Sequence, residues 1–267
     1  MIKPTTNLQD FALKSTPELL ERSRDLMRYA RSGAAAMLGD RVTSASFLSM
    51  MGRRKDIIDE NAGAVREVAA EQGLHVACGD RCHYCCFQDI HITIAEAAFI
   101  VMTAGDDLDR IVRRAVEIAP KVSGLSPGQR YKMSTPCPLL VVRSCGSYAT
   151  RPDVCRSYMS ASKTACQGEW NARKSKGPQK VVPILAEPLQ INEAISAGAE
   201  IALMQAGLAT GKYELTQAIV VMSRPGAVDM WLNGGDPFIG EEQRVNQFNG
   251  RPFCMMLKEM ADSLEKS

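Results

Sequence analysis

Apolar residues recur at three- and four-residue intervals over the first 70 residues and again over the last third of the chain. This spacing is typical of helices that pack through one face. Pro17 and Glu18 fit the first turn of a first helix, and a second helix is predicted from Thr43 to Glu71, with Gly73 as its C-cap. The two helices predict a helical hairpin ahead of the middle of the chain.

Further helices are predicted after this hairpin. Thr93 and Glu96 have the spacing of a capping box, which predicts a helix that runs to about Met102. Another helix is expected to begin at Asp106 or Asp107 and to end at Pro120. In the last third, the pattern predicts helices over 189–204, 213–222, 227–232 and 253–264. The predicted fold class is therefore mainly α, with helices flanking a long irregular cysteine-rich metal-binding segment.

Residues 121–188 show no long period, because glycines and prolines interrupt them repeatedly. Short strands are predicted at 139–142 and, with a proline inside it, at 181–185. A long irregular stretch within a compact protein needs something to hold it. We expect one compact unit with three parts: a helical hairpin over 1–74, a cysteine-rich metal- or cluster-binding region over 75–186, and a helical region over 187–267.

Composition narrows the class of protein. The 267 residues are 45% hydrophobic, which suits a globular chain with a real core, and the formal charge of +2 gives no reason to expect nucleic acid. The first residues lack the apolar stretch of a signal peptide, and no apolar run approaches the roughly 20 residues of a membrane span. We expect a cytoplasmic protein without a membrane partner. In that reducing compartment, nine cysteines indicate metal or redox chemistry rather than disulfides.

The cysteines fall in two groups that predict a metal site. Four lie within nine residues, in the run Cys78-Gly-Asp-Arg-Cys82-His-Tyr-Cys85-Cys86, and four more follow between 137 and 166. Thiolates are soft ligands that select zinc, Cu(I) or iron–sulfur clusters. The predicted metal ligands are Cys78, Cys82, Cys85, Cys86, Cys137, Cys145, Cys155 and Cys166. Cys254, beside two methionines, is predicted to be a buried apolar thiol.

The spacing favours one kind of metal centre. Structural zinc usually takes four ligands in two Cys-x-x-Cys pairs, which this chain lacks. Uneven spacing with surplus cysteine suits an iron–sulfur cluster better, so a [4Fe–4S] cluster is the favoured cofactor and zinc is the alternative. Cys85 and Cys86 are adjacent and are expected to point in different directions, so that one of them serves a second site, a bridge or a redox role.

Residues near the cysteines have competing interpretations. His83 could be a ligand, although a role outside the ligand set is favoured, and ligation is not favoured for His75 or His91. Arg151 and Arg156 could offset the charge of a cluster, or could pair with Asp153 or another carboxylate. The arginines of 110–114 are expected to form a solvated face.

The second cysteine group has a distinctive order: Pro136-Cys137-Pro138, then Cys145-Gly-Ser-Tyr148, then Arg151-Pro-Asp-Val-Cys155-Arg156. With the CxxxCxxCC run, this order resembles the YkgJ family, a zinc- or iron-chelating domain named for its CxxCxxCC motif. The resemblance covers roughly residues 75–160. The first gap in this chain has three residues where the family name has two. The cysteine cluster also resembles that of a flagellin lysine methylase. This resemblance implies S-adenosylmethionine as a cofactor and a protein as the substrate.

The spacing Cys78-x-x-x-Cys82-x-x-Cys85 also matches the radical S-adenosylmethionine motif. That fold alternates strands and helices, whereas this pattern is helical on both sides of the cysteine loop, so the interpretation is disfavoured. Two classes of function stay open. The first is a cluster protein with redox or group-transfer chemistry. The second is a zinc- or iron-chelating storage, delivery or structural adaptor module without catalysis, with metal ions and a protein as its partners.

Overall fold

The computed structural model describes residues 17–79, 81–240 and 253–265. The fold is mainly α, as predicted, and its strands are two or three residues long. No helix in these ranges is both long and apolar enough to cross a membrane. The first 16 residues of the predicted N-terminal hairpin and the last two residues of the chain lie outside the described ranges.

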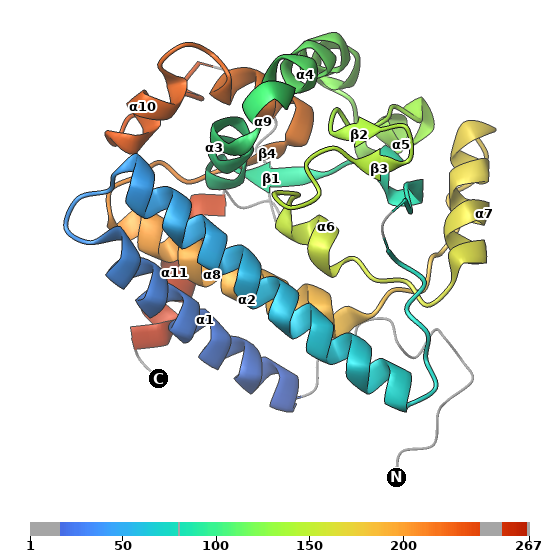
Figure 1. Cartoon of the computed structure of the whole chain (residues 1–267), viewed down its shortest axis with the longest axis horizontal. Coiled ribbons are helices and arrows are strands. Elements are labelled where there is room, and N and C mark those ends of the chain that lie inside the picture. Colours follow the sequence, from blue (N-terminus) through green and yellow to red (C-terminus); the bar gives the residue numbers. More distant parts are fainter. Residues whose placement is uncertain (1–16, 80, 241–252, 266–267) are drawn as a thin grey trace.

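Three long helices lie side by side along one edge of the molecule (Figure 1). They are α1 (Pro17–Leu38), α2 (Ser44–Glu71) and α8 (Ala186–Gln205). Helices α1 and α8 approach closely at Gly198, where an added Cβ would lie 2.3 Å from the carbonyl oxygen of Met27. Only glycine fits there, so this crossing is set by one residue.

The predicted second helix is confirmed. Thr43 is the N-cap of α2, and its side chain accepts the backbone N–H of Ser46 while the Ser46 side chain accepts that of Thr43. Gly73 follows the helix with a φ of +76°, the left-handed conformation that glycine adopts without strain. Met50, Met51 and Phe47 of this helix are buried.

A second group of helices covers the other side of the core (Figure 1). They are α3 (Ile94–Thr103), α4 (Leu108–Val122), α9 (Leu215–Met222) and α10 (Ala227–Leu232), with a 3-10 turn at Gly105–Asp107. The strand β1 (His91–Thr93) pairs antiparallel with β4 (Lys212–Glu214), with Ile92 opposite Tyr213. The core between the two groups includes Phe47, whose ring lies 5.0 Å from that of Trp231.

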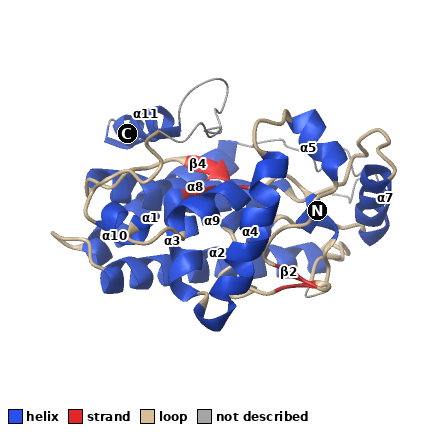
Figure 2. Ribbon diagram, turned by 90° about the horizontal axis from the view of Figure 1, so that it is seen from above, coloured by secondary structure: helices blue, strands red, loops and turns tan. Residues whose placement is uncertain are grey.

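The middle of the chain holds more helix than predicted. It contains α5 (Pro127–Met133), α6 (Asp153–Ser157) and α7 (Lys163–Lys174). Apolar periodicity does not reveal α7, because the buried face of this helix includes the ion pair between Glu169 and Arg173. Helices α5 and α7 lie together at one end of the molecule (Figure 2), and α11 (Phe253–Glu265) lies against α8.

Several boundaries also differ from the prediction. Helix α4 continues past Pro120 because Val122 remains buried in the core and the proline stands in its last turn. The predicted strand at 139–142 is β2 (Leu140–Val141), paired with β3 (Ser144–Cys145). The stretch at 181–185 forms only an isolated bridge, between Ser160 and Ile184.

Candidate metal centre

Seven of the eight predicted ligands border one cavity of about 90 Å³. Four come from the first cysteine group and three from the second: Cys78, Cys82, Cys85 and Cys86, with Cys137, Cys145 and Cys155. The two groups therefore meet in the fold although some 50 residues separate them in the sequence. Their role as ligands stays a prediction.

Backbone hydrogen bonds hold the first group. The thiol of Cys78 accepts the backbone N–H of Ser160 at 3.1 Å, and the guanidinium of Arg66 donates to the carbonyl of Cys78 at 3.0 Å. Cys85 and Cys86 lie in a short 3-10 helix, η2 (Tyr84–Phe87). Both residues border the same cavity. Neighbours in a 3-10 helix stand about 120° apart around its axis, so the expectation that the two side chains point in different directions stays a prediction.

The second group is tied to the first through the main chain. The N–H of Cys137 donates to the carbonyl of Cys86 at 2.7 Å. Arg114 of α4 donates to the carbonyls of Leu140 and Cys137, the latter at 3.4 Å. The prediction of a solvated face is therefore wrong for Arg114, because this side chain fixes the loop that carries Cys137.

Helix α6 carries Cys155 and is anchored by buried charges. The N–H of Asp153 donates to a carboxylate oxygen of Glu96 at 2.8 Å. The Asp153 carboxylate accepts Nε of Arg54 at 2.7 Å and lies 2.5 Å from Nζ of Lys55. Burial alone would raise the pKa of Asp153, but Arg54 and Lys55 hold that pKa well below its usual range. These residues position the helix, and a search for apolar periodicity could not have found them.

The cavity wall is positively charged. Four arginines border it, and none of its described lining residues is an aspartate or glutamate. The arginines are Arg66, Arg81, Arg151 and Arg156. Arg156 pairs with Asp59, and Arg151 lies 3.8 Å from the same carboxylate. The sequence left open whether these two arginines pair with Asp153 or with another carboxylate, and the carboxylate that both face is that of Asp59.

Burial controls the thiol protons. It raises the pKa of Cys78 to about 11 and raises the pKa values of Cys137 and Cys155 further above the ordinary range. For Cys85, a hydrogen bond with Cys86 and then burial raise the pKa. The facing sulfurs also repel one another as thiolates. A positive ion would remove both penalties, so metal binding here would release protons.

The thiols border the cavity without forming a coordination shell. Across the described ranges, no three side chains of His, Cys, Asp or Glu are close enough together to hold an ion. The donor set suits a soft metal, and the cavity is several times the space that a single ion or water needs. Ligation would require the sulfurs to move inward.

The other predicted residues lie around this cavity. Cys166 of α7 is not among the lining residues, although it is an electrostatic neighbour of Cys78. Cys254 lies on α11 and is partly buried. His83 is buried, with its ring 5.7 Å from that of Trp170, and His91 lies 3.3 Å from Asp89. Neither histidine borders the cavity.

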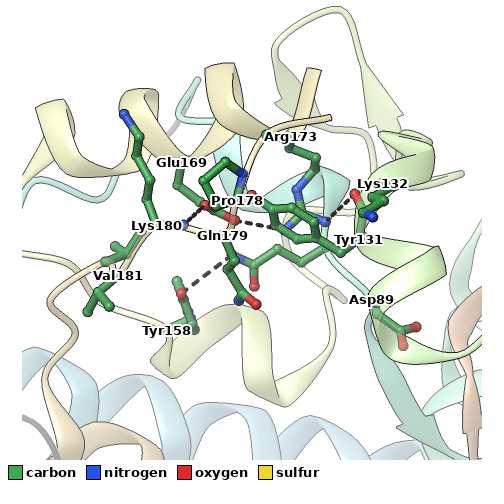
Figure 3. Close-up of a pocket in the computed structure, with 14 residues that line it drawn as sticks. Asp89, Tyr131, Lys132, Tyr158, Glu169, Arg173, Pro178, Gln179, Lys180 and Val181 are labelled. Carbon is green, nitrogen blue, oxygen red and sulfur yellow. Dashed lines mark hydrogen bonds and ion pairs between the residues drawn. The ribbon is translucent and has the colours of Figure 1, made fainter. Parts of the chain in front are cut away.

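A larger pocket, of about 780 Å³, is drawn in Figure 3. Tyr158 borders both spaces, and its hydroxyl accepts the Gln88 amide at 3.4 Å. Inside the pocket, the Glu169 carboxylate accepts the Tyr131 hydroxyl and the Arg173 guanidinium, each at 3.1 Å. The sequence did not predict this pocket; the four-residue spacing of Glu169 and Arg173 was its one local signal.

Comparison with known proteins bears on the same segment. No curated protein matches the chain, and no solved structure matches it. Residues 77–176, which include the eight cysteines of both groups, match the model of the CxxCxxCC family, described as a "Putative zinc- or iron-chelating domain". The cysteine-rich part of this chain is thus similar to a zinc- or iron-chelating module.

Proposed function

We propose that the cavity binds an iron–sulfur cluster of the [4Fe–4S] type through cysteines of both groups. The observation that carries this proposal is the meeting of seven thiols at one cavity. A structural zinc ion and a [4Fe–4S] cluster each take four thiolates, so the number of thiols does not separate them. The uneven spacing of the cysteines, without the two Cys-x-x-Cys pairs typical of structural zinc, is what favours the cluster.

The charge of the wall supports the same centre. A cluster held by four thiolates is anionic, and a partly buried anion needs compensation. Arg66 stands at the cavity wall, and Arg151 and Arg156 share the single carboxylate of Asp59 outside it, so three arginines face one carboxylate. Their guanidinium groups would offset the negative charge of the cluster, which is largest in its reduced form.

The adjoining pocket gives the proposed cluster a partner space. Its volume of about 780 Å³ lies within the range of small-molecule sites, and Tyr158 joins it to the thiols. We therefore propose redox or group-transfer chemistry for the centre. S-adenosylmethionine-dependent methylation of a protein is one reaction of this kind, and its only support is the resemblance of the cysteine cluster to that of the flagellin methylase.

A second function is chelation without catalysis. Here zinc or iron would be stored, delivered or used to hold the segment. It is favoured by the partial exposure of every cysteine and by the absence of a closed ligand set among the described residues, because an open site exchanges its metal easily. The similarity to a zinc- or iron-chelating domain fits this function equally well.

Anaerobic purification followed by analysis of iron, zinc and acid-labile sulfide separates the two. Iron with equivalent sulfide, and an electron paramagnetic resonance signal after reduction, supports the cluster. A colourless protein with stoichiometric zinc and no sulfide overturns it in favour of chelation.

Single substitutions assign the ligands. Cys137→Ser and Cys155→Ser are expected to remove most of the bound metal, because both thiols border the cavity. Cys254→Ser is the matched control, because that thiol lies on α11 and not at the cavity. Metal content that stays unchanged in both cavity variants would contradict ligation by the second cysteine group.

A further inference from the structure

A separate cavity of about 220 Å³ lies between α8 and α11. Asp153 and Val154 of α6 border it, and the next residue, Cys155, borders the thiol cavity. Helix α6 therefore contributes to both walls. Nothing in the proposed metal chemistry uses this second space.

One side of the cavity is apolar. Helix α11 lays Phe253, Met256, Leu257 and Met260 along it. Figure 2 shows this helix at the outside of the molecule, and its packing is against α8. Met255, the neighbour of Met256, does not border the cavity and is 50% exposed. The cavity thus has an apolar cover formed by one face of one helix.

The opposite side is polar and carries more negative than positive charge. The bordering carboxylates are Glu96, Asp153, Glu193 and Glu200, and the bordering cations are Arg54 and Lys212. Lys55 stands behind Asp153 as a third cation. Among the described residues that border the cavity, carboxylates outnumber cations four to two, and the bordering imidazole of His91 contacts Asp89 instead.

Glu200 is the group on which this excess is most evident. It is 1% exposed, and it forms an ion pair with Arg54, which also serves Asp153. Burial raises the pKa of Glu200 in spite of that arginine and of a hydrogen bond with the Thr93 side chain. A buried carboxylate that shares its cation is under-compensated, because a buried charge costs free energy unless it is fully paired.

Asn192 is an independent indication of a missing partner. It is 4% exposed, borders the cavity, and makes one long hydrogen bond, from the Ser196 hydroxyl at 3.5 Å. The Ser196 hydroxyl donates to Asp153 at 2.7 Å, so its longer contact with the Asn192 oxygen is weak. The amide can turn about its last bond, so it can offer the cavity either oxygen or nitrogen.

We propose that this cavity binds a small organic ammonium ion with an apolar body. The ammonium group would lie beside Glu200 and supply positive charge to the polar side of the cavity, which Asn192 also borders. The apolar body would lie against Met256 and Met260 under α11. An inorganic cation would neutralise the charge but leave the apolar side unfilled, so the affinity should rise with the size of the apolar body until the cavity is full.

The experiment measures binding to the full chain by titration calorimetry and thermal shift, at constant ionic strength. The probes are ammonium, butylammonium and phenethylammonium chlorides. We expect saturable binding that tightens in that order. Met256→Trp should weaken phenethylammonium binding at least about tenfold, which corresponds to about 1.4 kcal/mol, because the indole fills the cavity. Met255→Trp is the matched control and should leave binding unchanged, since that side chain is exposed.

Glu200→Gln should also weaken phenethylammonium binding about tenfold or more, since it removes the excess charge. If that variant fails to fold, the methionine pair decides alone, because both methionine substitutions leave the charged groups in place. The proposal is overturned if no probe binds saturably, if ammonium binds as tightly as phenethylammonium, or if Met256→Trp leaves binding intact. Metal content should stay the same in the two methionine variants, so their outcome is independent of the proposed cluster.

Discussion

At the scale of single residues, Glu96 links a helix end to the candidate metal centre. One carboxylate oxygen accepts the N–H of Thr93 at 3.0 Å and completes the capping box of α3. The other accepts the N–H of Asp153, 57 residues later in the chain. The capping box could be predicted from its spacing. The second bond could not, because no local pattern connects residues so distant in sequence.

Glu96→Gln tests this double role. The amide oxygen can keep the capping bond, but the amide nitrogen would then face the N–H of Asp153 and leave it unpaired. A buried unpaired N–H costs about 1–3 kcal/mol, so the free energy of unfolding should fall by that amount in denaturant titration. Glu117→Gln, on an exposed position of α4, should change stability little. Equal stability of the two variants would contradict the role of Glu96.

At the scale of helices, the packing of α1 on α8 depends on a residue with no side chain. A Cβ at Gly198 would lie 2.3 Å from the Met27 oxygen and 3.0 Å from the Cβ of Ala30. Gly198→Ala should therefore force the helices apart and cost about 1–3 kcal/mol or more. Gly63, inside α2, has nothing within 4 Å of such a Cβ.

Gly63→Ala is the control, and it should stabilise the chain by about 0.5–1 kcal/mol, since alanine is the better helix former. The two substitutions are chemically identical, so opposite signs in thermal unfolding would show that the α1–α8 crossing decides the outcome. A gain of stability in both would mean that the helices do not approach at Gly198.

The same scale shows what the sequence could reveal. Helices α2 and α3 were predictable because Thr43 and Thr93 cap them and apolar residues follow at helical spacing. Helix α7 was not, because buried Glu169 and Arg173 satisfy each other and resemble a surface pair. Arg54 likewise looks solvated in sequence but is 3% exposed. Apolar periodicity detects hydrophobic faces and misses buried ion pairs.

At the scale of the whole molecule, the candidate site could be predicted further than the pockets around it. Thiol chemistry predicted that Cys82 and Cys155 would lie at one centre whatever the fold between them, and both border one cavity. By contrast, the pocket at Tyr158 and the cavity under α11 arise from elements that meet only in the folded chain. A metal site that needs several cysteines can be inferred from one sequence, because the cysteines themselves are visible in it. The shape of a cavity cannot, because it depends on how distant elements pack.

Hydrogen exchange can locate the effect of the metal within the molecule. The α1–α8 pair packs through its own apolar contacts, including the buried Ala30 and Ile195, and no cysteine takes part. The cysteine segments instead depend on loops fixed by single bonds such as that from Cys137 to Cys86. Metal should therefore slow exchange at 81–87 and 137–157 by at least about tenfold and leave α1 and α8 unchanged.

The measurement compares chelated with reconstituted protein by mass spectrometry. Cys254→Ser should reproduce this pattern, and Cys155→Ser should lose it. Equal protection of α1 and α8 would mean instead that the whole chain folds only around its metal, as a structural zinc adaptor would.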